Sequence, residues 1–235
     1  MKIAVLIYGQ LRELPIGIKS WGFKNELDCD FYFSVWDKVK MESENLKIIE
    51  EYNITEDDIL KYIPSAKIEI HDESKIFGKG TEHYPPKSHK VAYHMKNAFK
   101  MLELSGEKYD FIMLTRSDMF LHYNKWSEFL TFNKEKTIYA VRDFYMSPEN
   151  KISVYDTFLY GSFDVMSNLI KNIPIDLMGM HIELAEIIMK CGYNVVGLTH
   201  KFGCITIRPN CRDLKGNELN QINVAKKMVE WGSNH

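Results

Sequence analysis

Long apolar runs, a strong net charge and a signal peptide are all missing from this sequence. No apolar stretch approaches the roughly 20 residues that cross a bilayer, and the start, MKIAVLIYGQ, lacks the small-residue cleavage site of a secretory signal. The formal net charge of −2 provides no overall positive field to attract nucleic acid. The sequence therefore predicts a cytoplasmic protein with no transmembrane segment and no nucleic-acid partner.

Motifs rich in cysteine or glycine are also absent. Neither GxGxxG nor GxxxxGK followed by Ser or Thr occurs, which argues against a dinucleotide Rossmann site and a P-loop. The four cysteines are spaced neither as a disulfide scaffold nor as paired zinc ligands, so we expect buried thiols at Cys29, Cys191, Cys204 and Cys211.

What the chain does contain is typical of a packed α/β domain. Of its 235 residues 45% are hydrophobic and 13% aromatic, and alternating apolar runs predict strands and helices in turn. Strands are expected at residues 2–8, 30–36, 66–70, 109–115, 137–141, 157–161, 194–198 and 204–208. Helices are expected through Trp21 and Phe23 and over 42–62, 88–105, 162–173, 178–192 and 218–231, with a long surface loop at 71–88. We therefore predict one α/β domain with a mixed, mainly parallel sheet between helices.

Polar residues follow the first two predicted strands, where ligands bind in open α/β sheets. Gly9 lets the backbone approach a ligand, Gln10 offers an amide to a base or ribose, and Arg12 offers a guanidinium to a phosphate. Asp37 follows the second strand and is a candidate contact for the ribose or base. A surface arginine in a turn and a helix cap are the structural alternatives for Arg12 and Asp37.

The segment YDFIMLTRSDM places Arg116 and Asp118 at the end of the most strand-like run. An aspartate in this position can hold a divalent cation, and that cation can neutralise a diphosphate leaving group. Arg116 points the same way if the segment stays extended, and can pair with a diphosphate or orient the aspartate. The alternative is an Arg–Asp ion pair at a strand end.

The order of four segments resembles the GT-A glycosyltransferases, especially the poorly characterised ones of surface-polysaccharide gene clusters and of large viruses or phages. These segments lie between residue 3 and about residue 166, and are IYGQLREL, DFYFSVWD, SHKVAYHMKNAFKMLELSGEKYDFIMLTRSDM and DTFLYGSFDVM. The resemblance implies a Rossmann-like GT-A fold over residues 1–235, with a nucleotide-binding half at about 1–122 and an acceptor-side half at about 123–235. It also implies the host cytoplasm as the location if the gene is viral.

What the resemblance implies for function is polysaccharide biosynthesis: transfer of a sugar from a nucleoside diphosphate sugar to a glycan or lipid-linked acceptor. The family binds its metal and diphosphate with Asp-x-Asp, but here Arg116 stands at the place of the first aspartate. Two readings stay open. Asp118 holds Mn²⁺ or Mg²⁺ together with His200, or Arg116 replaces the metal; a loop or core role is the alternative for His200.

A transferase that inverts the sugar also needs a base for the acceptor hydroxyl. Asp156, ahead of the strand TFLYG, is the first candidate and Glu183 the second, although a solvated helix face also accounts for Glu183. His181 is the third candidate, but it shares a helical stripe with Leu184 and Ile188, which favours a buried structural histidine over a base.

Two other functions fit the same sequence. A sugar nucleotidyltransferase has a similar fold, but Gly9-Gln10-Leu11-Arg12 is short of the basic, glycine-rich first loop expected for it. A non-catalytic glycan-binding module would keep the fold without a second aspartate, and it need not bind a nucleotide. Nucleotide binding therefore separates the enzymatic readings from the binding module.

Overall fold

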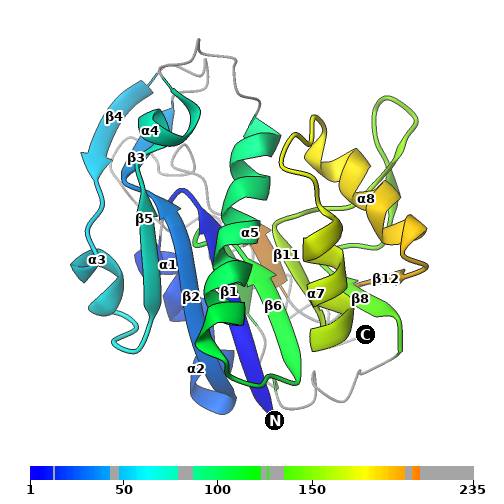
Figure 1. Cartoon of the computed structure of the whole chain (residues 1–235), viewed down its shortest axis with the longest axis horizontal. Coiled ribbons are helices and arrows are strands. Elements are labelled where there is room, and N and C mark those ends of the chain that lie inside the picture. Colours follow the sequence, from blue (N-terminus) through cyan, green and yellow to red (C-terminus); the bar gives the residue numbers. More distant parts are fainter. Residues whose placement is uncertain are drawn as a thin grey trace.

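The centre of the molecule is a seven-stranded, mostly parallel sheet (Figure 1). The computed structural model describes residues 1–12, 14–42, 48–78, 87–122, 126, 135–198 and 203–206. In order across the sheet the strands are β12 (Asn194–Gly197), β8 (Thr137–Ala140), β11 (Phe158–Ser162), β6 (Phe111–Thr115), β1 (Lys2–Gly9), β2 (Asp28–Trp36) and β5 (Lys67–His71). Only β11 is reversed in this sheet, because it pairs antiparallel with both β6 and β8. The predicted α/β class and mainly parallel sheet are confirmed.

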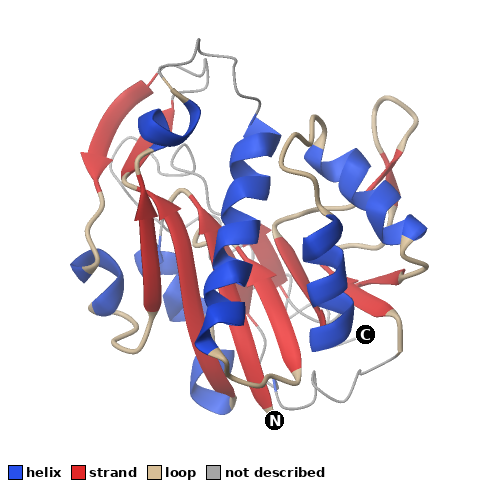
Figure 2. Ribbon diagram, viewed as in Figure 1, coloured by secondary structure: helices blue, strands red, loops and turns tan. Residues whose placement is uncertain are grey.

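Helices cover both faces of the sheet, which is why β1 and β6 are continuous apolar runs without alternation (Figure 2). One face carries α5 (Lys87–Ser105), α7 (Phe163–Asn172) and α8 (Met180–Lys190). The other carries α1 (Leu14–Ser20) and α2 (Phe23–Glu26), whose apolar residues pack with Trp21 and Trp126. Each face of the sheet thus has its own apolar cluster.

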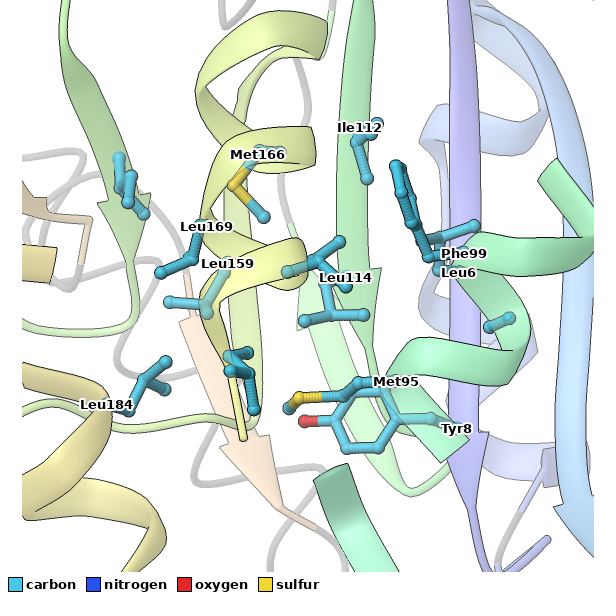
Figure 3. Close-up of a cluster of buried hydrophobic side chains, with 14 of the residues drawn as sticks. Leu6, Tyr8, Met95, Phe99, Ile112, Leu114, Leu159, Met166, Leu169 and Leu184 are labelled. Atoms are coloured by element: carbon cyan, nitrogen blue, oxygen red, sulfur yellow. The ribbon is translucent and has the colours of Figure 1, made fainter. Parts of the chain in front are cut away.

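Helix α5 follows the predicted pattern closely. Its buried residues recur at helical spacing and lie on β1 and β2, and Gly106, with φ of 67°, ends the helix. Figure 3 shows the cluster beneath it, with Met95 and Phe99 of α5 beside Leu6 and Tyr8 of β1. Tyr8 lies at the end of this cluster, near the carboxyl end of β1.

The predicted helix over 42–62 is wrong for the described residues 48–53 and holds only for a short helix near its end. This region instead holds β3 (Lys38–Glu42) and β4 (Ile48–Asn53), which pair antiparallel, and a short α3 (Asp57–Leu60). The glutamates and lysines of the segment favour a helix by propensity. Strand pairing and the burial of Val39 outweigh that preference.

The remaining elements are short. The predicted loop at 71–88 contains α4 (Glu73–Phe77), while β9 (Tyr145–Met146) pairs with β10 (Ile152–Ser153) and β7 (Met119–His122) with β13 (Gly203–Thr206). The helix expected at 218–231 lies outside the described residues. Within the described ranges, none of the helices combines the length and the apolar character needed to cross a membrane.

Candidate functional site

The direction of the strands brings the predicted site residues to one edge of the sheet. The carboxyl ends of β1, β2, β5 and β6 meet there because these strands are parallel. Since β11 runs the other way, its first residue, Phe158, pairs with Thr115, the last residue of β6. Asp156, just before β11, therefore reaches the edge that Arg116 and Asp118 occupy just after β6.

Arg116 and Asp118 form a bidentate ion pair. The chain turns after Thr115, and the Nε and Nη2 atoms of Arg116 donate to the two carboxylate oxygens of Asp118 at 2.9 and 2.5 Å. The Asp118 side chain is 2% exposed and that of Arg116 30% exposed. Burial alone lowers the pKa of Arg116, but the charge and hydrogen bonds of Asp118 outweigh it and raise that pKa. The guanidinium is thus a permanent cation held in one orientation.

The first loop is fastened to this turn. The Ser117 hydroxyl points at the backbone carbonyls of Gln10 and Arg12, at 3.1 and 2.9 Å. The Nε of Arg12 donates to the Gln10 side-chain oxygen at 2.5 Å. Gly9 has a φ of 95°, a conformation that other residues rarely adopt. Loop 9–12 and turn 116–119 therefore form one unit.

Tyr8 connects this unit to Asp156. Its buried hydroxyl donates to the backbone carbonyl of Asp156. Burial raises the pKa of Tyr8, the negative charge of Asp156 raises it further, and Arg116 opposes both. The guanidinium, the phenol and the Asp156 carboxylate thus lie within electrostatic range of one another.

A second group of polar side chains lies on the other side of Asp156. The Nε2 atom of His181, on α8, is 3.4 Å from the Oδ1 atom of Asp156. The Nδ1 atom of His181 is 3.2 Å from the Tyr145 hydroxyl, on β9. The Tyr155 ring stacks on that of Tyr145 with centroids 4.6 Å apart. Asp156 therefore lies between the Arg116 turn and this histidine–tyrosine group.

Two predicted residues, Asp37 and Glu183, are not part of this arrangement, and a third cannot be compared with it. Asp37 lies at the same edge, but two strands from β6, and its backbone bonds His71 and Ile54; no helix follows that it could cap. Glu183 caps the start of its own helix, accepting from the backbone N–H groups of residues 178 and 179 at 3.0 and 2.7 Å. His200 lies outside the described residues.

The arrangement at Asp118 does not fit a divalent cation. Both carboxylate oxygens accept from Arg116, and the Asp118 side chain is 2% exposed, so a cation would meet the positive guanidinium at a buried carboxylate. Searching the part of the chain that the structure describes for three or more His, Cys, Asp or Glu side chains placed to hold a metal finds none. The structure therefore has the Arg116–Asp118 ion pair, which the sequence offered as the alternative to a metal site.

Sequence reasoning missed Tyr145, and it preferred a core role for Tyr8 and a buried structural role for His181. Tyr8 reads as one more apolar residue of a buried strand, and Tyr145 lies on a two-residue strand with no periodic signal. His181 was expected in the core, but its side chain is 41% exposed. The one signal for His181 was its place near the start of an amphipathic helix.

Comparisons with known protein families and with curated proteins do not identify the chain. No protein-family model matches the chain, and no curated protein matches its sequence.

Proposed function

We propose that this chain is a glycosyltransferase that moves a sugar from a nucleoside diphosphate sugar to a glycan or lipid-linked acceptor. The observation that carries the proposal is the meeting of a fixed guanidinium, Arg116, and a carboxylate, Asp156, at the carboxyl edge of a mostly parallel sheet. The transfer needs a cation for the leaving diphosphate and a base for the acceptor hydroxyl.

Arg116 has the features of a phosphate-binding group. The Nε and Nη2 atoms of Arg116 donate hydrogen bonds to Asp118. Within the described residues, the Nη1 atom of Arg116 donates none. The side chain is 30% exposed, so this nitrogen can reach a ligand at the sheet edge. Arginine binds phosphate oxygens through such charge-assisted hydrogen bonds. In this proposal Asp118 orients the guanidinium and Arg12 supplies a second positive charge.

Loop 9–12 is the proposed place of the nucleotide. Gly9 lets the backbone turn closely over the end of β1, and Ser117 holds the carbonyls of the loop against the Arg116 turn. A nucleotide on this loop would direct its diphosphate at Arg116 and the anomeric carbon of the sugar toward Asp156. The acceptor hydroxyl would then approach from the Asp156 side, and its proton would pass to the side chains around Asp156.

The first test is a thermal-shift panel of UDP, GDP, CDP, dTDP and their sugars, each with Mn²⁺, with Mg²⁺ and with EDTA. A ligand that binds the folded state raises the melting temperature. We expect one nucleotide family to raise it in EDTA as well as with metal, because Arg116 carries the diphosphate charge. No shift with any nucleotide would contradict the proposal and favour a glycan-binding module.

A paired substitution links the shift to this site. Changing Arg116 alone would leave Asp118 buried without its partner, so the variant to use is Arg116→Gln with Asp118→Asn, which removes both charges together. The exposed Lys171–Glu103 ion pair offers a matched control, Lys171→Gln with Glu103→Gln. We expect the site variant to fold but lose the nucleotide shift and sugar transfer, and the control to keep both. A site variant with full activity would remove Arg116 from the proposal.

A further inference from the structure

Asp156 is poorly placed to take a proton from a substrate directly. Its side chain is 6% exposed, and its backbone carbonyl is held by Tyr8. His181, the neighbour of its carboxylate, is 41% exposed. A group that exchanges protons with an acceptor must be reachable by it. The accessible end of this cluster is therefore on the His181 side.

The carboxylate determines which nitrogen of His181 bears the proton. The Nε2 atom of His181 lies 3.4 Å from the Asp156 carboxylate, an ion-pair contact, and a proton on this nitrogen is favoured because a lone pair there would face the negative charge. The Nδ1 atom then carries a lone pair, and the Tyr145 hydroxyl, 3.2 Å away, donates to it. In this tautomer Tyr145 donates to His181, and His181 directs its N–H at Asp156.

The tyrosine at the outer end is suited to pass a proton on. Tyr145 is half-buried on the β9–β10 hairpin, which packs against α8. Burial raises the pKa of Tyr145, and the neighbouring Tyr155 and Asp156 raise it further. The hydroxyl is therefore protonated near neutral pH, and acts as donor to His181 and acceptor from a substrate without forming a free phenolate.

We propose that Asp156, His181 and Tyr145 are a proton relay, with Tyr145 as the residue that touches the acceptor. The relay rests on the proposed transferase function. The acceptor hydroxyl gives its proton to the Tyr145 oxygen while the proton of Tyr145 moves to Nδ1 of His181. The acceptor oxygen forms the bond to the anomeric carbon, and the bond to the diphosphate breaks, its electron pair leaving with the phosphate. The resulting imidazolium is stabilised by Asp156, which is a positioning residue.

The first experiment reads the tautomer of His181 by two-bond ¹H–¹⁵N NMR of histidine-labelled protein, with His181→Gln to assign the signal. We expect the Nε2–H form in the unsubstituted protein. Asp156→Asn should shift it toward the Nδ1–H form, because the amide can donate to Nε2 where the carboxylate could not. An Nδ1–H ring in the unsubstituted protein would overturn the relay, and this readout needs no activity.

The second experiment measures transfer with the nucleotide sugar identified by thermal shift. Tyr145→Phe keeps the ring and removes the relaying oxygen, so we expect kcat to fall on the order of 100-fold, in the range of general-base contributions, with little change in KM. The control is Tyr193→Phe, whose hydroxyl accepts from Asn168 on an exposed surface. Unchanged kcat in Tyr145→Phe overturns the relay while leaving the transferase standing. Absence of any nucleotide response overturns the transferase, and with it the role of the relay.

Discussion

Ser117 joins two loops that are far apart in the chain. Its hydroxyl is 2.9 Å from the carbonyl of Arg12, which is 105 residues away. Behind this contact, α1 packs so closely that a Cβ atom on Gly17 would lie 2.3 Å from the Ser117 carbonyl oxygen and 3.1 Å from that of Met119. Glycine is needed at position 17 because the backbone of the Arg116 turn occupies the space of a side chain.

The first prediction in this region concerns Gly17→Ala. Both atoms that the new methyl group would meet are backbone atoms, so the turn must move, and we expect a loss of about 1–3 kcal/mol in the free energy of unfolding. The nucleotide shift should weaken as well, because Arg116 moves with the turn. Urea unfolding measures the first effect and the thermal panel the second.

Gly22→Ala is the matched control. A Cβ atom there would lie 3.4 Å from the Trp126 Nε1 atom, an ordinary contact, and the backbone of Gly22 is already helical. We expect little change, or a slight gain from the reduced freedom of the unfolded chain. Equal losses in the free energy of unfolding would show that the close contact between position 17 and the Arg116 turn does not cause the destabilisation.

At this scale the sequence predicted one site for Arg116, Asp118 and Asp156 and offered an Arg116–Asp118 ion pair as an alternative, but it did not predict the geometry of the contacts. Arg116, Asp118 and Asp156 were found because polar side chains at strand ends stand out against apolar runs. That Arg116 occupies both oxygens of Asp118 depends on the turn after Thr115, and a motif does not encode it. The cap made by Glu183 likewise depends on the local path of the chain.

Between elements, a hydrogen-bonded chain joins β2, β5 and α5 at the same edge of the sheet. The Ser34 hydroxyl lies 2.8 Å from Nδ1 of His94 and 3.1 Å from Nε2 of His71. The Tyr93 hydroxyl lies 3.2 Å from Nδ1 of His71. With both rings neutral, each hydroxyl and ring nitrogen of this chain has one role, donor or acceptor. The chain therefore favours uncharged histidines.

We predict that acid destabilises the protein through His94. Burial lowers the pKa of His94 well below its ordinary value of 6.5, and nearby His71 lowers it further. The unfolded chain therefore takes up the proton first as the pH falls. Stability from the neutral ring is complete above about pH 6.5 and declines below it.

Urea unfolding at several pH values between 5 and 8 checks this prediction. We expect His94→Gln to be less stable near neutral pH, since Ser34 loses a well-fitted partner, but to show a flatter pH dependence than the unsubstituted protein. If the two proteins lost stability in parallel as the pH falls, His94 would not be the group responsible.

The elements themselves were predictable to the extent that packing agrees with local preference. Helix α5 was found because its apolar stripe and its terminal glycine point to the same structure. The β3–β4 hairpin was missed because its glutamates and lysines favour helix, and pairing between strands is not visible in either strand alone. The reversal of β11 was missed for the same reason.

For the whole molecule, the sheet unites the two halves that the sequence suggested. β11, β8 and β12 belong to the second half, yet β11 pairs along its length with β6 of the first. Helices α5 and α7 also contact each other across this boundary. The halves share one sheet and one apolar cluster on its α5 face, so neither has a separate core.

We therefore predict a single cooperative unfolding transition. Three of the four tryptophans, Trp21, Trp36 and Trp126, are buried in or near the first half, so with Trp231 replaced by Phe the fluorescence reports that part, while far-UV circular dichroism reports the described helices and strands of both halves. The two signals should change at the same urea concentration. A dichroism change that precedes the fluorescence change would mean that the second half unfolds alone.

The central position of β1 has a consequence for how the protein is made. β1 is synthesised before the other strands of the sheet, and β2 can pair with it soon after, but its other neighbour is distant: Ile3 of β1 pairs with Phe111 of β6, 108 residues later. Until that length of chain has left the ribosome, one edge of an apolar strand has no native partner. Such long-range pairing slows folding and exposes strand edges to aggregation. β1, a central strand of the finished sheet, is thus the strand whose edge toward β6 waits longest for its native partner during synthesis.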